Sequence, residues 1–324
     1  MGKDELSADD AWQTLRQYGR WNLIRDAFVR FRYGDGFSHS RALALQLCLA
    51  VVPFLIALTG LAADLGVESG GRIVADTVLA LTPGSSAALV QQVLRGGEGA
   101  SDTGEFALVS GLITGLVALA TAMAQVERGA NRMYGVERDR PALRKYARAA
   151  VLSVVAGLPA FGGFLLMVAG RPFGHAVVVE LGWSSRVEVG WEVVRWPLGL
   201  LLTVVSIAVL FEQAPRRRQP GLSWLAFGAG VATVLWLLAT LLLAIYVRGS
   251  GAFPAMYGPL TAVMALLLWA NLTSIALLLG LAFAAQLEAV RVGQPDPAEP
   301  DRWRPATFEP VPDEQAPGVE AKTS

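Results

Sequence analysis

A group of polar side chains follows the second long apolar stretch of the chain. Glu127, Asn131 and Tyr134 have the spacing i, i+4, i+7, so a helix places them on one side. Arg128 and Arg132 fall on another side of the same helix. Two functions fit this arrangement. One is a polar inner mouth that binds an anionic headgroup or gates a cavity; the other is a helix end anchored at the phosphate layer of a membrane.

Two further groups of polar residues belong with this cluster. Asn271 and Ser274 are three residues apart and share a helix face, where they either make interhelical hydrogen bonds or line a substrate path. An Arg-Arg-Arg turn lies between Pro215 and Pro220, where we expect it to set topology and contact lipid. The candidate lipid-binding residues are Gln125, Glu127, Asn131, Tyr134, Asn271 and Ser274, and the candidate anionic-lipid contacts are Arg128, Arg132, Arg216, Arg217 and Arg218.

The residues required for common enzymatic sites are missing from the sequence. No acid or base lies near the middle of an apolar stretch, which disfavours a simple proton relay. His39 and His175 are expected on opposite sides of the membrane, so they cannot share a metal or a catalytic triad. Cys48 is the single cysteine, and no glycine loop precedes Lys and Ser or Thr. We therefore predict no enzymatic activity, no metal and no cofactor.

Six long uncharged stretches must position these residues. A bilayer core of about 30 Å takes roughly 20 apolar residues of helix, and apolar runs without alternation exclude a β-barrel. Charged residues make up 17% of the chain, against about 25% in soluble domains. The sequence predicts an all-α, polytopic membrane protein. Its transmembrane domain is 37–291, with spans at about 42–63, 106–126, 148–169, 191–211, 222–246 and 258–284.

The distribution of Lys and Arg predicts the orientation. Segments on the N-terminal side of the predicted membrane hold 21 of the 27 Lys and Arg, and the opposite side holds six. The positive-inside rule then places both termini in the cytoplasm, with the protein in the bacterial inner membrane. The formal net charge is zero, which gives no basic signature for nucleic acid, so the expected partners are membrane lipids. The oligomeric state stays open.

Three segments outside the spans have patterns of their own. Residues 1–36 predict a basic amphipathic helix on the inner membrane surface, beginning after Ser7 and broken by Gly34 and Gly36. Its apolar residues at helical spacing are Trp12, Leu15, Trp21, Ile24, Phe28 and Phe31. Residues 64–105 predict an external helical hairpin, either a lid or a packed structural element. The tail, 292–324, holds seven prolines and seven acids and predicts disorder.

The order of several short motifs over residues 20–291 resembles the YihY/BrkB family of bacterial inner-membrane proteins. The matching landmarks are Ser40-Arg41-Ala42-Leu43-Ala44, Pro53-Phe54-Leu55, Asn131 with Tyr134-Gly135-Val136, Arg138, Pro215, Pro220-Gly221, Tyr246, Tyr257-Gly258, Leu267-Leu268-Trp269 and Leu279-Gly280. The resemblance implies a six-span protein linked to envelope integrity and to the movement of lipids or other substrates. Some such proteins were once labelled ribonucleases, a label that these residues do not support.

The chain departs from the family pattern after Gly280. The family usually continues with Ala-Glu, whereas Leu281-Ala282 stands here, so the embedded acid is replaced by Ala282. If that acid couples ions in relatives, this protein works uncoupled or through another residue. Two functions remain open: an envelope-integrity protein that transports a lipid or amphipathic solute, and a scaffolding membrane protein that recruits partners. A polar cavity open to one leaflet would favour the first, and a solid bundle the second.

Overall fold

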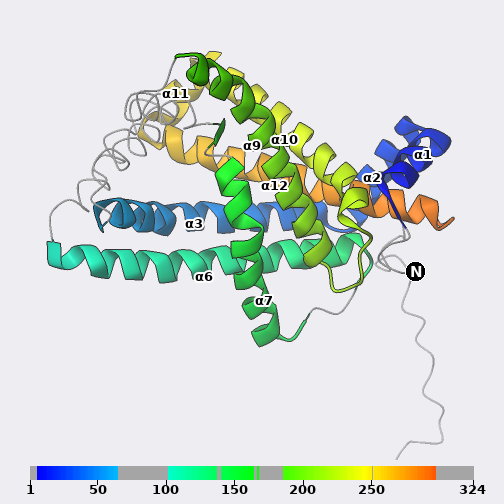
Figure 1. The fold of residues 1–324 in the computed structure, drawn as a ribbon, viewed down its shortest axis with the longest axis horizontal. Coiled ribbons are helices and arrows are strands. Elements are labelled where there is room, and N and C mark those ends of the chain that lie inside the picture. Colours follow the sequence, from blue (N-terminus) through cyan, green and yellow to red (C-terminus); the bar gives the residue numbers. More distant parts are fainter. Residues whose placement is uncertain are drawn as a thin grey trace, which may run out of the picture.

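The computed structural model describes residues 6–64, 101–136, 140–163, 166–167, 185–249 and 251–296, and this part of the chain is helical without a strand (Figure 1). The all-α prediction is confirmed for these residues. The helices are α1 (Ala8–Tyr18), α2 (Arg20–Tyr33), α3 (Gly36–Asp64), α6 (Ser101–Met133), α7 (Ala142–Val155), α9 (Ser185–Gln213), α10 (Leu222–Gly249), α11 (Ala252–Tyr257), the 3-10 turn η1 (Gly258–Leu260) and α12 (Thr261–Arg291).

Five helical stretches of the described residues are long and apolar enough to cross a membrane. They are Val109–Met133, Ala142–Gly163, Val189–Gln213, Leu222–Val247 and Val263–Arg291. These correspond to the second to sixth predicted spans. The first predicted span, 42–63, lies within α3, a 29-residue helix whose side chains beyond Ala50 are described only at Pro53. The structure thus supports five of the six predicted spans. The remaining one, the first, rests on the sequence.

Helix α12 is the centre of the bundle. It packs on α2, α3, α6 and α10, and it is the most buried of the five candidate spans. Helices α3 and α6 form a long pair beside it, α7 packs on α6, and α9 packs on α10 (Figure 1). Membrane helices associate through close backbone contact and packing rather than through a hydrophobic drive, so a central helix needs small residues where its neighbours cross.

Small residues mark the crossing of α10 and α12. A Cβ on Gly280 would lie 2.5 Å from Ala232 Cβ and 2.7 Å from the Gly228 carbonyl oxygen. A Cβ on Gly228 would lie 2.7 Å from Ala284 Cβ. Each helix therefore presents a Gly-x-x-x-Ala pair to the other, a spacing that brings two backbones close together.

The fourth predicted span contains Arg195, and the structure explains how α9 accommodates it. Its side chain is buried, forms an ion pair with Glu192 at 2.7 Å, and donates a hydrogen bond of 2.8 Å to the Met167 carbonyl oxygen. The guanidinium also lies over the Trp196 ring. A paired and hydrogen-bonded arginine near a helix end is tolerated at the membrane boundary, so α9 reaches a full candidate span.

The N-terminal segment forms two helices where the sequence predicted one. Ser7 caps α1 through a reciprocal contact with Asp10, as its position predicted. Gly19, with φ of +90°, then separates α1 from α2. Helix α2 ends at Tyr33 and α3 begins at Gly36, so the predicted break is confirmed. Both short helices pack on the end of α12, and α1 also contacts α10.

Some apolar side chains of this N-terminal segment are buried against the protein, and others are exposed. Trp21 is 82% exposed, whereas Phe31 is 0% exposed and packs edge-on against Phe37 at 4.9 Å between ring centroids. A Cβ on Gly36 would meet the Phe31 ring at 2.4 Å, so the glycine makes room for that ring. Grouping Phe31 with the surface-facing aromatic residues was wrong, because the turn into α3 folds a protein neighbour over it.

Two sequence predictions lie outside the described residues. Residues 65–100 include nearly all of the predicted external hairpin, and residues 297–324 include most of the predicted disordered tail. The part of the tail that is described, up to Asp296, contacts the bundle, because Gln286 Nε2 donates a 2.5 Å hydrogen bond to the Pro295 carbonyl oxygen.

Candidate functional site at the basic end of the bundle

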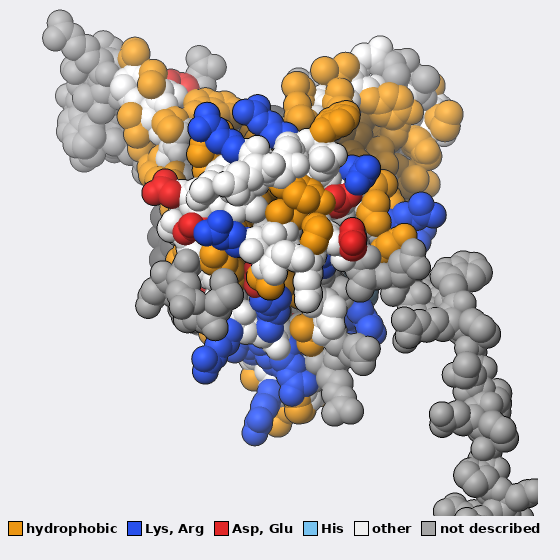
Figure 2. Space-filling model, turned by 90° about the vertical axis from the view of Figure 1, so that its right-hand side faces the viewer, with side chains coloured by type: hydrophobic (Ala, Val, Ile, Leu, Met, Phe, Trp, Pro, Cys, Tyr) orange, Lys and Arg blue, Asp and Glu red, His pale blue; other side chains and the backbone are white. Residues whose placement is uncertain are grey.

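One end of the bundle gathers the cluster that the sequence singled out. Here α6, α9 and α12 end and α3, α7 and α10 begin, and we call it the basic end. Figure 2 views this end and shows Lys and Arg side chains spread over it, with a group at its lower part, toward which α7 extends in Figure 1. The site is therefore built from helix ends, where backbone carbonyl groups lack partners within their own helix.

Glu127 lies inside the protein near the end of α6. It is 3% exposed, and its Oε1 lies 2.8 Å from Nη1 of Arg140. The contact is a charge pair without the alignment of a hydrogen bond. Arg140 also donates hydrogen bonds of 3.0 Å to the carbonyl oxygens of Ala214 and Pro215. One guanidinium thus neutralises a buried acid on α6 and binds carbonyl groups at the end of α9.

Asn131 lies one helical turn further along α6. It is 1% exposed, and its Oδ1 accepts a 2.7 Å hydrogen bond from the backbone N–H of Arg216. This N–H belongs to the connection between α9 and α10, which lies outside the regular helices. The amide side chain supplies its acceptor, so Asn131 fixes the Arg-Arg-Arg turn against α6.

Tyr134 completes the row and contacts a different set of groups. The guanidinium of Arg217 lies over its ring at 4.8 Å from the centroid, and Arg217 pairs with Glu288 of α12. Burial raises the pKa of Tyr134, and the negative charge of Glu288 adds to this, while Arg217 and Arg30 oppose it. The phenol therefore stays protonated at physiological pH.

Arg30 of α2 also lies at the basic end, where it contacts α12 and α6. Its Nε donates a 2.7 Å hydrogen bond to Gln286 Oε1, and its Nη1 donates one of 3.4 Å to the Met133 carbonyl oxygen. Gln286 is fully buried. The sequence analysis did not single out Arg30 or Gln286 as site residues, because their pairing joins positions 256 residues apart.

The remaining predicted contacts divide by exposure. Arg128, Arg132 and the turn Arg216, Arg217 and Arg218 are exposed. Gln125 is half-buried, and its Nε2 lies 3.2 Å from Nδ1 of His39 on α3. The arginines thus lie where they can reach an anionic surface, whereas Gln125 contacts another helix.

Asn271 and Ser274 lie in α12, apart from this end. Ser274 is fully buried, and its hydroxyl donates a 2.7 Å hydrogen bond to the Ala270 carbonyl oxygen of its own helix. This bond stays within α12, because a serine can return its proton to the carbonyl group four residues earlier, and an interhelical bond of Ser274 stays a prediction. Asn271 is half-buried. The structure does not join this pair to the cluster on α6.

A basic pocket opens beside the Glu127–Arg140 pair. It has a volume of about 340 Å³ and is lined by Arg140, Pro141, Arg144, Arg148 and Arg216. Arg148 reaches across it to the end of α9, where Nη2 donates to the Gln213 carbonyl oxygen at 3.1 Å and to Oε1 of the same residue at 2.8 Å. The sequence analysis missed this pocket as a site, although Arg144 and Arg148 are four residues apart on one face of α7, and Arg140 lies just before the helix begins.

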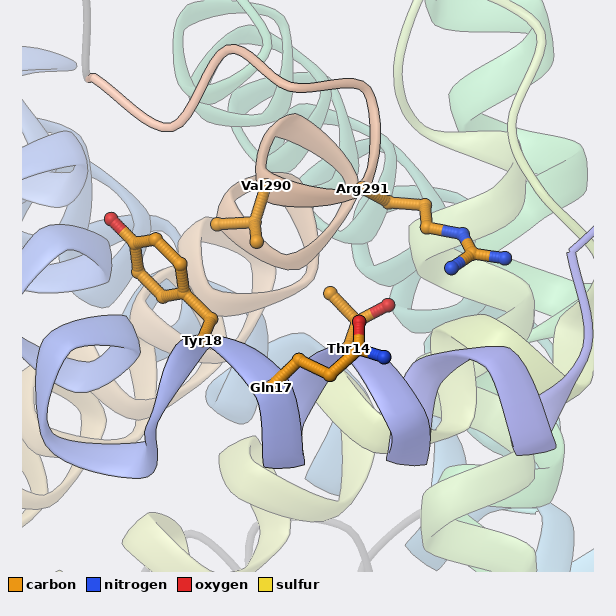
Figure 3. Close-up of a pocket in the computed structure, with 5 residues that line it drawn as sticks. All are labelled: Thr14, Gln17, Tyr18, Val290 and Arg291. Atoms are coloured by element: carbon orange, nitrogen blue, oxygen red, sulfur yellow. The ribbon is translucent and has the colours of Figure 1, made fainter.

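A second hollow, of about 270 Å³, separates α1 from the end of α12. Thr14, Gln17 and Tyr18 line it from α1, and Val290 and Arg291 from α12 (Figure 3). An ion pair of 2.9 Å between Arg291 and Asp10 joins the two helices at this place. Tyr18 is engaged elsewhere, because its hydroxyl donates to Asp26 at 2.8 Å. The hollow therefore marks the place where the N-terminal helix docks.

A metal-dependent reaction has no visible site among the described residues, where no three His, Cys, Asp or Glu side chains gather as a ligand set.

The family model described as virulence factor BrkB matches residues 27–305. The chain belongs to this BrkB family. The resemblance noted in the sequence is thereby confirmed, and the protein is a membrane protein with several apolar helices.

Relatives of this BrkB protein have two kinds of name. The chain is 26% identical over 259 residues to a protein of Bacillus subtilis named ribonuclease-like protein YfkH, covering 80% of this chain and 92% of the relative. It is 28% identical over 186 residues to UPF0761 membrane protein RSc1559 of Ralstonia nicotianae, covering 57% of this chain and 40% of the relative. A third, UPF0761 membrane protein azo3165 of Azoarcus sp., is 26% identical over 265 residues, which are 79% of this chain and 62% of the relative.

The chain thus spans nearly the whole Bacillus relative but less than two thirds of the Ralstonia and Azoarcus proteins. No solved structure matches it. The BrkB description and the UPF0761 names designate a virulence factor and membrane proteins and do not state an activity, so function has to be argued from the residues of this chain.

Proposed function

We propose that this BrkB family member is a multi-pass protein of the bacterial inner membrane, with both termini in the cytoplasm, that maintains the envelope by moving an anionic lipid or amphipathic solute. The basic end of the bundle is then cytoplasmic, as the positive-inside rule requires. Anionic lipids of the cytoplasmic leaflet attract such a surface by about 1 kcal/mol for each Lys or Arg near it.

The observation that carries the proposal is the meeting of several helix ends around Glu127, Asn131 and Tyr134. Each of these three side chains contacts a different partner: Arg140 before α7, the Arg216 backbone and Arg217 of the α9–α10 connection. These contacts join α6 to the start of α7 and to the α9–α10 connection. Polar contacts between rigid helices have discrete alternative partners, which is what a gate needs in order to open and close.

The proposed transport is tested in vesicles. The purified protein is inserted into phosphatidylcholine vesicles that carry a trace of fluorescent phosphatidylglycerol or fluorescent phosphatidylcholine, and a membrane-impermeant quencher reports movement between leaflets. We expect faster movement of the anionic lipid than in protein-free vesicles. Arg217→Met should alter the rate, because it removes the contacts to Tyr134 and Glu288, whereas the exposed Arg20→Gln should not. If correctly inserted wild-type protein moves neither lipid, lipid transport is excluded.

Scaffolding is the second candidate, and one observation favours it. Helix α1 is joined to α12 by the Asp10–Arg291 pair and α2 by the hydrogen bond of Arg30 to Gln286, while Trp21 and Ile24 stay exposed. A docked helix pair with exposed apolar side chains is suited to a partner protein as well as to a lipid surface. Exchange of Trp21 for Ser that abolishes complementation of an envelope-stress phenotype, with lipid movement unchanged, would favour the scaffold.

We also propose that the protein is not a ribonuclease, although the Bacillus relative is named ribonuclease-like. Among the described residues of this cluster, the two acids, Glu127 and Glu288, are both paired with arginines, so neither is placed as a general base beside an open site. Purified protein incubated with RNA, with and without divalent cations, should leave the RNA intact. Cleavage that copurifies with the protein and disappears in a Glu127→Gln variant would overturn this.

A further inference from the structure

The basic pocket at the start of α7 is lined by positive charges, one of which, Arg140, is paired with Glu127 outside the lining. Its five lining residues are four arginines and a proline, without a carboxylate among them. Like charges gathered in one hollow repel one another, and a bound anion relieves that repulsion. A volume of about 340 Å³ has room for a phosphate group with substituents. Pocket composition therefore points to a phosphate-bearing ligand.

The start of α7 adds to the attraction. Pro141 is the N-cap residue and makes no side-chain capping bond, so it supplies no side-chain acceptor to the N–H groups of the first helical turn. Such groups, with the positive end of the helix dipole, favour an anion. Here the helix end coincides with a pocket and with arginines one and two turns along the same face, Arg144 and Arg148.

Two of the arginines hold the pocket's shape. Arg140 binds the carbonyl oxygens of Ala214 and Pro215, and Arg148 binds Gln213, so both connect the start of α7 to the end of α9. A guanidinium has five N–H donors, and these bonds use only part of them. Arg144 is exposed on the same face. The walls are thus fixed by existing bonds while N–H donors stay available to a ligand.

The face of α7 beyond the pocket is apolar. Arg144, Arg148, Val151 and Val155 have the spacing i, i+4, i+7, i+11, which places them in one row along the helix. Val151 and Val155 are exposed, and they lie within the candidate span Ala142–Gly163. A ligand with a phosphate group and hydrocarbon chains would fit this surface. Its phosphate would bind the arginines of the pocket, and its chains would pack on the exposed valines.

We propose that this pocket binds the phosphate headgroup of an anionic phospholipid whose chains lie along Val151 and Val155 of α7. This inference rests on the proposed function, since it names the headgroup chemistry and the place of binding. Arg144 is the main recognition residue, because Arg140 and Arg148 also make structural bonds to the end of α9. Arginine suits this role because its planar fork matches two phosphate oxygens at once, which lysine does not.

Binding can be measured apart from transport. The full chain in a neutral detergent is mixed with phosphatidylglycerol or with phosphatidylcholine of the same acyl chains, and native mass spectrometry gives the fraction of protein that carries lipid. We expect phosphatidylglycerol to bind in preference. Arg144→Gln should weaken that binding about tenfold, the expected cost of losing a hydrogen bond between charged groups. Arg144→Lys should give an intermediate affinity.

The controls separate the other outcomes. Arg20→Gln removes an exposed arginine of α2, outside the pocket, and should leave binding unchanged. Equal binding by Arg144→Gln and wild type, or equal binding of the two lipids, would overturn the inference. Inorganic phosphate that displaces the lipid completely and binds as tightly would assign the pocket to soluble phosphates instead. Because binding is read without lipid movement, a failure of transport does not affect this test.

Discussion

Asn131 Oδ1 accepts a hydrogen bond of 2.7 Å from the backbone N–H of Arg216, 85 residues later in the chain. The bond attaches the Arg-Arg-Arg turn to α6 and so holds the backbone of Arg216, which lines the basic pocket, in place. Asn131, which the sequence indicated as a lipid-binding candidate, thus has a structural role, because it binds a backbone group.

Exchange of Asn131 for Leu is expected to destabilise the protein. It leaves the Arg216 N–H without this acceptor in a partly buried place, which costs at most about 1–3 kcal/mol. The melting temperature of the detergent-solubilised variant should fall, while Asn131→Asp, which keeps an acceptor oxygen, should retain most of the stability. An unchanged melting temperature with lost complementation would instead give Asn131 a direct role in transport.

The pair of Glu127 and Arg140 makes a prediction for a double-mutant cycle. Arg140→Met leaves Glu127 buried without its counter-charge, and breaking a buried pair in this way costs about 3–5 kcal/mol. Glu127→Gln added to Arg140→Met should recover part of that loss, because the uncompensated charge is gone. The free energies of unfolding of the four proteins give the coupling. Additive single effects would contradict an energetic link between the two residues.

The crossing of α10 and α12 predicts a strong size limit at Gly280. Leu at this position places side-chain atoms where Ala232 and the Gly228 backbone now lie, and overpacking of this kind costs about 1–3 kcal/mol or more. Gly280→Leu should therefore reduce the yield of monodisperse protein in size-exclusion chromatography. Gly230 is the matched control in α10, because a Cβ there meets nothing within 4 Å. Gly230→Ala should behave as wild type.

Phe31 and Trp21 should respond differently to truncation. Phe31 is fully buried, so Phe31→Ala is expected to lower the stability by about 3–5 kcal/mol. Trp21 is mostly exposed, so Trp21→Ser should leave the melting temperature unchanged and weaken the contact of α2 with a lipid surface. Quenching of tryptophan fluorescence by lipids that carry a quencher, with Trp12→Phe as a control, reports that contact. A large fall in stability for Trp21→Ser would mean that this residue packs on protein.

The orientation is tested by fusions to a reporter that is active only outside the cytoplasm. A fusion after Gly97 should be active, and fusions after Arg138 and Ser324 should be silent, because positively charged segments stay in the cytoplasm. The reverse pattern would place the basic end outside and remove the anionic leaflet from the proposed function.

The sequence by itself determined the class of protein and the order of its elements. Long uncharged stretches allow only helices in a membrane, and the described residues form helices at the predicted positions. Ser7 as a helix start and the break at Gly34 and Gly36 were also predictable, since caps and breaks have local signals, whereas the break at Gly19 was not predicted. That Glu127 and Asn131 share one side of a helix followed from their spacing.

Only the tertiary structure decided what these side chains contact. Asn131 meets a backbone group 85 residues away, and Arg30 meets Gln286 at a separation of 256 residues. Phe31 is buried although its spacing matches that of the exposed Trp21, because the turn at Gly36 folds α3 back over it. Periodicity gives the face of a helix on which a residue lies, but the neighbour that covers this face is set by packing between distant segments. The basic pocket exists for the same reason: the arginines of α7 form a hollow only where the end of α9 lies opposite them.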